Sequence, residues 1–372
     1  MFPEPASQEI DWNKLSLKGL DLTSHVESHY TTETGKWSAP EIVASPYLKV
    51  HGLSPGLNYG QQCYEGLKGK KNQSISVVCP VHRDLNKTPA CRTADNQILL
   101  FRPNEHANRM HHSTSTVSIP NVPEEHFLAC VNLVVAANSA FVPPHESNAL
   151  LYVRPVAFGS GPQLALTSPS EFTFAVFILP GSAYHGVTAQ DALVCEGFDR
   201  TAPLGVGNAK VGGNYAPVMK YTDQAYREGF SLLLHLDSLT HTEIDEFSTS
   251  GFLGVKAGDK PTLIVPSSRN ILPSVTTDTC IEVAKSLGWK VEKRTVKFDE
   301  VPFLDEVMAV GTATLLLPIK SITRRSTGEK ILFNEGKSEA GPCCETLRKT
   351  IDDILRGRGQ GPEGWSVAVK EV

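Results

Sequence analysis

Apolar positions in the first half of the chain fall into short runs that predict β-strands. The runs SISVVCPV, QILLFRP, NALLYVRPVAFG and EFTFAVFIL are rich in β-branched and aromatic residues, and Asn, Pro, Gly and Ser bound them. One helix interrupts these strands, because Pro123 and Glu124 suit a first turn. After that turn, apolar residues recur at helical spacing at Phe127, Cys130, Val131, Val134 and Val135. The pattern therefore predicts a sheet-rich first half with a single helix.

Helix and strand patterns alternate in the second half. The segment YAPVMKYTDQAYREG has a helical apolar stripe, and Gly229 is placed to end that helix before the strand FSLLLHL. Another helix is predicted from Thr277 to Leu287, with Gly288 as its stop. The change of pattern predicts a smaller sheet-rich domain over residues 1–178, a linker over 179–190 and a larger domain over 191–372.

Composition and charge describe an ordinary globular enzyme. The chain has 372 residues, 40% of them hydrophobic, and a net charge of −5, which argues against an extended nucleic-acid surface. Its acidic start, MFPEPASQEIDW, lacks a signal core or an Arg-rich presequence, and no apolar run approaches a membrane helix. We therefore expect a cytoplasmic rather than mitochondrial protein that binds neither nucleic acid nor membrane. The eight cysteines predict reduced thiols, with the adjacent Cys343 and Cys344 free, and the glycines of RGRGQGPEGW predict a flexible tail.

The stretch GVGNAKVGGNY places Lys210 between two glycine-rich turns. A phosphate-binding P-loop needs Gly before the lysine and Ser or Thr after it, whereas Ala209 and Val211 stand there. A dinucleotide-binding loop needs a third glycine at the position of Lys210 itself. Two interpretations stay open from these residues alone, a solvated loop charge or an amine nucleophile that forms a Schiff base.

Six segments in order distinguish these interpretations. The loop GNAKVGGNY resembles the lysine loop of branched-chain amino acid aminotransferases, the fold-type IV pyridoxal 5′-phosphate (PLP) enzymes. The other five segments are LNYGQQCYEG (57–66), LFRPNEHANRM (100–110), IDEFSTSGF (244–252), LPSVTTD (272–278) and EVMAVGTA (306–313). The resemblance runs from about Leu57 to the C-terminus. It implies a two-domain α/β (α+β) scaffold with PLP in the interdomain cleft, a homodimer, and small-molecule amino acid and 2-oxo acid substrates.

The resemblance also implies roles for single residues. Lys210 matches the Schiff-base lysine that moves the α-proton of the substrate, and Tyr215 matches the tyrosine that bonds the phenolic oxygen of the cofactor. Arg109 matches the phosphate-binding arginine, and Arg102 is interpreted as a nearby decoy. The phosphate is also expected to meet Val275 and Thr276, just before the Thr277 helix where free N–H groups favour an anion, and the hydroxyl of Thr312.

Two glutamates compete for the pyridine nitrogen of the cofactor. Glu246 has the family spacing to Gly251 and Phe252, so we expect Glu246 rather than Glu243 to bind there. Gly251 departs from the family, which usually has asparagine at this position. Glu243 and Asp245 are interpreted as solvated loop acids.

The matching substrate positions form an aromatic wall with one cation. The residues expected near the substrate side chain are Tyr59, Tyr64, Tyr152, Arg154 and Tyr184. Arg154 is expected to meet the side-chain carboxylate of glutamate, and the N–H groups of Thr312 and Ala313 the α-carboxylate. Tyr64 stands where the family commonly has phenylalanine. The expected reaction is transamination between a branched-chain amino acid (Leu, Ile or Val) and 2-oxoglutarate.

The resemblance leaves one segment unexplained and several alternative functions open. Gly69–Asp95 is longer than its family counterpart, and its Cys79, His82 and Cys91 are too irregularly spaced for us to expect a metal site. The alternatives are an aminotransferase for another apolar amino or keto acid in specialised metabolism, and an aminodeoxychorismate lyase, against which the YVRP and VGTA motifs argue. A cofactor-free binding protein on the same scaffold would be colourless when purified.

Overall fold

The computed structural model describes residues 2–12, 14–15, 24–70, 97–144, 147, 149–181, 188–312, 315–355 and 358–372. The chain forms two compact units by contact. Unit 1 comprises Met1–Tyr184, Lys210–Gly212 and Asp352–Val372, and unit 2 comprises His185–Ala209 and Gly213–Ile351. The units differ from the expected ranges 1–178, 179–190 and 191–372 at Lys210–Gly212 and at Asp352–Val372, which both belong to unit 1. Among the described helices, none has both the length and the apolar character that a bilayer crossing requires.

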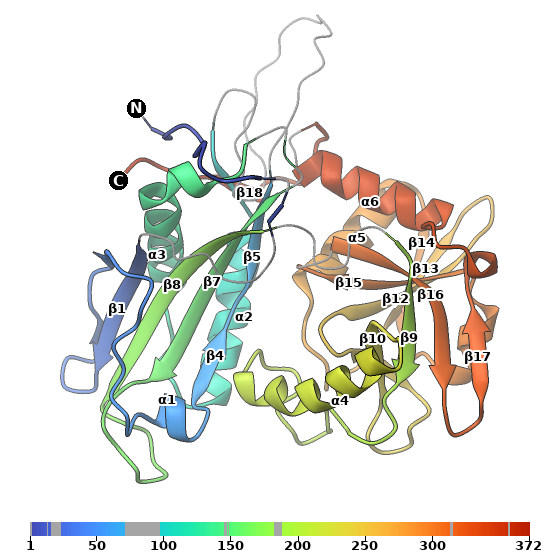
Figure 1. Ribbon diagram of the computed structural model, residues 1–372, viewed down its shortest axis with the longest axis horizontal. Coiled ribbons are helices and arrows are strands. Elements are labelled where there is room, and N and C mark those ends of the chain that lie inside the picture. The colour runs from blue at the N-terminus through green and yellow to red at the C-terminus, as the bar shows by residue number, and fades with distance from the viewer. Residues whose placement is uncertain are drawn as a thin grey trace, which may run out of the picture. The chain divides into compact units, whose positions relative to one another are not determined.

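Unit 1 is built on an antiparallel sheet in the order β2-β1-β8-β7-β4, with β3 paired to β1 and β5 paired to β7 (Figure 1). Its strands are β1 (His25–Thr31), β2 (Lys36–Trp37), β3 (Glu41–Val43), β4 (Gln62–Tyr64), β5 (Leu67–Lys70), β7 (Leu150–Gly159) and β8 (Glu171–Gly181). A single turn of helix, α1 (Pro55–Asn58), precedes β4, and a 3-10 turn, η1 (Ser139–Phe141), precedes β7. The strands β7 and β8 confirm two of the predicted runs, whereas SISVVCPV lies outside the described residues.

Two helices pack on this sheet, although the sequence predicted one. The predicted helix is α3 (Glu124–Ala137), which contacts β1 and β8, and its five expected apolar residues are all buried. The helix α2 (Pro103–Thr116) contacts α3 and β4 (Figure 1) and contradicts the expectation of a single helix. It has no apolar stripe because its buried face is largely polar, with His106, Arg109, Ser113 and Thr114.

The C-terminal residues are held on unit 1. The strand β18 (Ser366–Ala368) pairs with β6 (Leu99–Phe101), and Trp365 is buried beneath Arg102, whose guanidinium carbon lies 4.7 Å from the ring centroid. The expectation of a flexible tail is therefore wrong for the described residues 358–365 of that stretch, because it ends in a buried tryptophan that leads into a short sheet.

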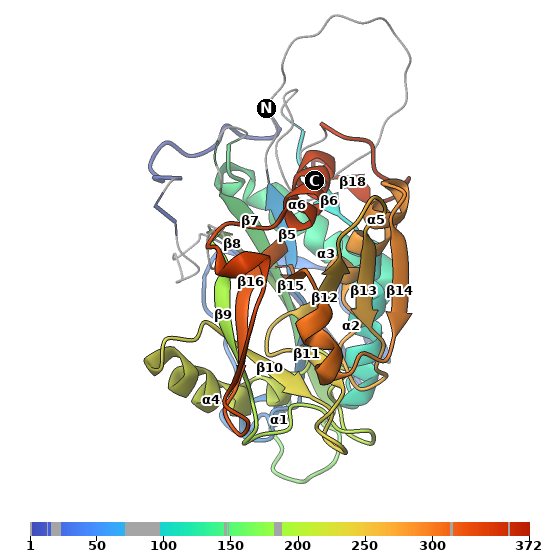
Figure 2. The ribbon, with the colours of Figure 1, turned by 90° about the vertical axis from the view of Figure 1, so that its right-hand side faces the viewer.

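Unit 2 contains a mixed sheet in the order β11-β10-β9-β16-β15-β12-β13-β14, with β17 paired to β16. Its strands are β9 (Gln190–Val194), β10 (Leu232–Leu236), β11 (Ile244–Phe247), β12 (Gly251–Lys256), β13 (Thr262–Pro266), β14 (Lys290–Arg294), β15 (Glu306–Gly311), β16 (Leu315–Arg324) and β17 (Glu329–Leu332). The remaining elements, of which η2 begins and α6 ends in unit 1, are η2 (Gly212–Asn214), α4 (Ala216–Arg227), α5 (Val275–Ser286), η3 (Phe298–Phe303), η4 (Asn334–Gly336) and α6 (Pro342–Leu355). Figure 2 shows β12, β13 and β14 side by side, and α5 packs on β14 and β15.

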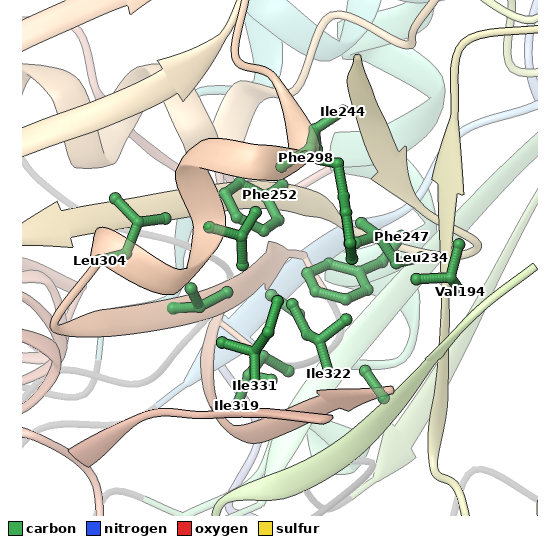
Figure 3. Close-up of a cluster of buried hydrophobic side chains, with 14 of the residues drawn as sticks. Val194, Leu234, Ile244, Phe247, Phe252, Phe298, Leu304, Ile319, Ile322 and Ile331 are labelled. Carbon is green, nitrogen blue, oxygen red and sulfur yellow. The ribbon is translucent and has the colours of Figure 1, made fainter. Parts of the chain in front are cut away.

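The core of unit 2 anchors the strand that carries Glu246. Figure 3 shows buried side chains from several strands and from η3 around Phe247 and Phe252, whose ring centroids lie 5.8 Å apart. Ile244 and Phe247 of β11 both belong to this cluster. Fully burying a residue such as phenylalanine contributes about 1.5–3 kcal/mol. The strand is therefore fixed on both sides of Glu246.

The two predicted helices of unit 2 begin and end within two residues of their predicted positions. Gly229 has φ +90°, a conformation that favours glycine, and it follows α4 as predicted. The helix α5 begins at Val275, two residues before the predicted Thr277, because Ser274 caps it: its hydroxyl accepts the N–H of Thr277 at 3.1 Å. Cys343 and Cys344 are free, as predicted.

Candidate active site

The Lys210 loop is bonded to two elements of unit 1. The backbone N–H of Lys210 donates to Ser113 Oγ on α2 at 2.9 Å, and its carbonyl accepts the N–H of Tyr64, on β4, at 3.0 Å. The next residue, Val211, forms a β-bridge with Cys63. The lysine backbone is therefore tied to both α2 and β4, which is more constraint than a solvated loop charge requires.

The side chain of Lys210 lies against an aromatic and cationic group. Its Nζ is 4.6 Å from the centroid of the Tyr64 ring. The guanidinium carbon of Arg154 lies 4.9 Å from the Tyr64 ring and 5.0 Å from the Tyr152 ring. Gly66 is required beside this group, because a Cβ there would lie 2.1 Å from Tyr152 Oη. Three of the expected substrate residues thus lie together with the lysine.

Other expected substrate residues lie elsewhere or outside the description. Tyr59 follows α1 and donates its hydroxyl to the Leu164 carbonyl at 2.6 Å. Gly56 of α1 packs against Gly159, so Tyr59 lies near the C-terminal end of β7. Tyr152 and Arg154 lie nearer the N-terminal end of that strand. Tyr184 and Ala313 lie outside the described residues.

A buried ion pair holds Arg109. Glu65, 0% exposed, accepts Nε and Nη2 of Arg109, each at 2.7 Å, and Nδ1 of His106 at 2.8 Å. Burial acts to raise the pKa of Glu65, but the charges and hydrogen bonds of Arg109 and His106 outweigh it and hold that pKa well below its usual range. Burial also lowers the pKa of His106, against the opposing effect of Glu65. The cluster therefore contains an ionised carboxylate and a fixed guanidinium.

Unit 2 brings Glu246 and Tyr215 to one arginine. Arg200 Nη1 donates to Glu246 Oε1, and both side chains are buried. The guanidinium carbon of Arg200 lies 5.4 Å from the Tyr215 ring centroid. The two residues predicted to contact the ring of the cofactor therefore share one partner, Arg200, which the sequence prediction did not include.

One acid next to Glu246 corrects the sequence interpretation. Asp245 is buried and accepts the hydroxyl of Thr201, and burial raises its pKa. It is not a solvated acid, because all four residues of β11 are buried on both faces of the strand. Glu243 is half-buried, and its main chain bonds with Asp237.

The first turn of α5 lies near the end of β15 in unit 2. Val275 and Thr276 occupy that turn, where the N–H groups have no acceptor earlier in the helix. A Cβ on Gly251 would lie 2.9 Å from Thr277 Oγ1, which has no hydrogen-bond partner within the described part of the chain. Gly251 pairs with Val310 of β15, and Thr312 follows that strand. Helix N-termini and threonine hydroxyls are groups that can bind anions in proteins.

Three supporting residues had no usable signal in the sequence. Glu65 and His106 fall inside quoted motifs, but neither is distinguished by composition, and Arg200 lies ten positions before Lys210 in a loop. What identifies each residue is burial of a charge or a polar ring against a specific partner, which only the folded chain reveals.

Known proteins resemble this chain over most of its length. The family model for amino-transferase class IV matches residues 90–322. Aminotransferase poxL of Penicillium oxalicum is 47% identical over 371 residues, covering 100% of this chain and 96% of poxL. Branched-chain amino acid aminotransferase gloG of Glarea lozoyensis is 44% identical over 368 residues, covering 98% of this chain and 97% of gloG. The PLP form of the Thermobaculum terrenum branched-chain amino acid aminotransferase has a TM-score of 0.71 at 20% identity, covering 94% of this chain and 99% of that one.

Proposed function

Because the chain belongs to the class IV aminotransferases, we propose that it exchanges amino groups between a branched-chain amino acid and 2-oxoglutarate. The observation that carries this proposal is the group around Lys210 in unit 1, where Nζ lies 4.6 Å from the Tyr64 ring and Arg154 lies over Tyr64 and Tyr152. Ring faces suit the apolar side chain of leucine, isoleucine or valine, and the guanidinium suits the side-chain carboxylate of glutamate. One wall therefore serves both substrates.

The side chains fit the chemical demands of PLP, on which this family depends. For the phosphate we propose Arg109, the N–H groups of Val275 and Thr276, and the hydroxyl of Thr312. The hydroxyl of Thr277, which has no hydrogen-bond partner among the described residues, supports an anion at the first turn of α5. When bound, PLP supplies an aldehyde that takes the amino group and a ring that withdraws electrons.

The ring contacts are proposed from the Arg200 group of unit 2. Glu246 is a buried carboxylate paired with Arg200, so it suits the protonated pyridine nitrogen. Tyr215, whose ring lies against the same guanidinium, has a hydroxyl suited to the phenolic oxygen. Arg200 therefore orients both groups.

Lys210 is the proposed catalytic residue. Its Nζ takes the proton from the α-carbon of the substrate and returns it to the acceptor carbon, acting as base and then acid. The bonds of its backbone to Ser113 and Tyr64 hold the starting position of this side chain. The N–H groups of Thr312 and Ala313 are proposed for the α-carboxylate, and Tyr59 and Tyr184 for the substrate side chain. The homodimer and the cytoplasmic location stay predictions.

The test is the visible spectrum of the purified protein loaded with PLP, followed by L-leucine and then 2-oxoglutarate. We expect a yellow protein that bleaches with leucine and recovers with 2-oxoglutarate, and a Lys210→Ala variant that does neither. A yellow protein that ignores leucine but responds to another amino acid would move the substrate and keep the reaction. Release of pyruvate from aminodeoxychorismate would instead favour a lyase, and a protein that binds no PLP would overturn the proposal.

A further inference from the structure

Arg109 is held by a carboxylate that the proposed reaction does not use. Glu65 directly follows β4, whereas Arg109 lies on α2. The two carboxylate oxygens of Glu65 accept hydrogen bonds from one edge of the guanidinium. Oε1 accepts from Nε and Oε2 from Nη2, each at 2.7 Å. This two-point contact fixes the plane of the guanidinium, whereas a single bond would let it rotate.

Glu65 is itself held in place. Its Oε2 also accepts Nδ1 of His106 at 2.8 Å and the N–H of Gly66 at 3.2 Å. Glu65, His106 and Arg109 are 0%, 3% and 8% exposed. Burial of two opposite charges contributes little net stability compared with apolar residues of the same size. An arrangement this fully bonded therefore requires a reason besides stability.

We propose that Glu65 is a positioning residue for phosphate binding. By holding the Nε and Nη2 edge of Arg109, it directs the opposite edge, which carries Nη1, towards the phosphate of PLP. The inference rests on the proposed phosphate-binding role of Arg109. Glu65 does not contact the cofactor in this proposal, so its effect passes entirely through the orientation of Arg109.

The same helix and strand also hold the lysine. The bonds from Lys210 to Ser113 of α2 and to Tyr64 of β4 lie beside the bonds that Glu65 makes across those two elements. Glu65 therefore fixes the phosphate-binding group on the scaffold that fixes the reacting amine. A displaced Arg109 guanidinium would therefore weaken binding of the phosphate, while every group proposed to contact the aldehyde of PLP stays in place.

The experiment compares PLP with pyridoxal, which has the same ring and aldehyde and lacks the phosphate. The dissociation constants of both are measured by absorbance with the apo forms of the wild type, Glu65→Gln and Glu65→Asp. Side chains that orient a ligand-binding group contribute about 10–100-fold to affinity at metal sites, and we expect a loss of PLP affinity of about tenfold or more in Glu65→Gln. Pyridoxal affinity should stay unchanged, and the ³¹P resonance of bound PLP should shift.

Two variants separate positioning from charge balance and from damage to the fold. Glu65→Asp keeps the negative charge but retracts it by one methylene, so it should retain a selective loss of PLP affinity and carries the test if Glu65→Gln does not fold. Glu105→Gln removes an exposed carboxylate from the same helix and should leave both affinities unchanged. Full recovery in Glu65→Asp would reduce Glu65 to a counter-charge and overturn the inference.

The remaining outcomes are equally decisive. An equal loss of both affinities in the Glu65 variants would contradict positioning, because that effect must be selective for the phosphate. Tighter PLP binding in Glu65→Gln would show that Glu65 competes with the phosphate for Arg109, which also overturns the inference. Arg109→Lys tests the premise that Arg109 binds the phosphate. If this variant and the Glu65 variants all leave the ratio of PLP to pyridoxal affinity unchanged, the proposed role of Arg109 fails. If Arg109→Lys changes the ratio and the Glu65 variants do not, only the role of Glu65 fails.

Discussion

The helices α2 and α3 have the same length and pack against each other in unit 1, yet they bury opposite chemistry. The buried face of α3 is apolar, whereas that of α2 carries His106, Arg109 and Ser113. Each polar group of α2 has a named acceptor or donor, since Glu65 bonds the first two and the backbone of Lys210 bonds the third. One helix therefore supports the core, and the other holds groups of the proposed site in position.

This contrast predicts two kinds of damage. Variants on the buried face of α3 should lower the free energy of unfolding and leave ligand preference intact, because its contacts are non-directional. Variants of the α2 group should lower stability and also change ligand binding or the pH dependence of stability, because its contacts are directional and involve charges.

Phe127→Ala should have the largest effect on stability. Phe127 is completely buried on α3, and its ring centroid lies 5.9 Å from that of Phe174 on β8. Removing the ring leaves a cavity, so the free energy of unfolding should fall by about 3–5 kcal/mol, measured by urea denaturation. The ratio of PLP to pyridoxal affinity at low temperature should match the wild type. A loss below about 1 kcal/mol would contradict the assignment of α3 to the hydrophobic core.

Glu65→Gln should change the pH dependence of stability. The folded-state pKa of Glu65 is depressed, so its contribution is fully present above the unfolded pKa of about 4.3 and is lost as the pH falls through the folded value. At pH 7 the variant should be less stable by about 3 kcal/mol, and the gap should narrow as the pH falls below about 4.3. Unfolding curves of both proteins between pH 7 and 3 measure this. A gap that is constant with pH would contradict an ionised Glu65.

Ser113→Ala should act mainly on the lysine. Ser113 is completely buried, and its hydroxyl accepts the N–H of Lys210 at 2.9 Å. The variant leaves that N–H unsatisfied, so we expect a loss of about 1–2 kcal/mol in stability together with a slower bleaching of bound PLP by leucine. Ser115→Ala is the matched control, because Ser115 is exposed on the same helix and its hydroxyl donates to the carbonyl of His111 one turn earlier. Equal bleaching rates in the two variants would contradict a role of Ser113 in positioning Lys210 for the reaction.

The sequence predicted the part of unit 1 that behaves like α3 and missed the part that behaves like α2. Apolar periodicity reveals a helix only when the buried face is apolar, so Phe127 and Val131 identified α3 whereas Arg109 and Ser113 concealed α2. The family motifs supplied Lys210, Arg109 and Glu246 as candidates. They did not supply Glu65 or Arg200, because the reason for each is a contact between distant segments.

The burial of Asp245 has no signal in the sequence for the same reason. Adjacent acids after a strand have the composition of a solvated turn. Only the fold shows that they lie in β11, which pairs with β10 and whose four residues are all buried, so that both faces of the strand are covered. The predicted start of α5 differs from the observed one by two residues. The reason is that the start depends on a single hydrogen bond, from the N–H of Thr277 to the hydroxyl of Ser274, which apolar periodicity does not reveal. Periodicity thus locates elements, and specific polar contacts locate their ends and their chemistry.

Asn132→Ala should have the smallest effect and tests the other side of α3. Its side chain exchanges two hydrogen bonds with the backbone of Lys370, at 2.8 and 3.1 Å, and so ties the C-terminal segment to this helix. Because these bonds are exposed to water, we expect a loss of about 1 kcal/mol in the free energy of unfolding and faster proteolysis after β18. The PLP-to-pyridoxal affinity ratio should not move. If it did, α3 would also orient groups of the site, and the division of roles between the two helices would fail.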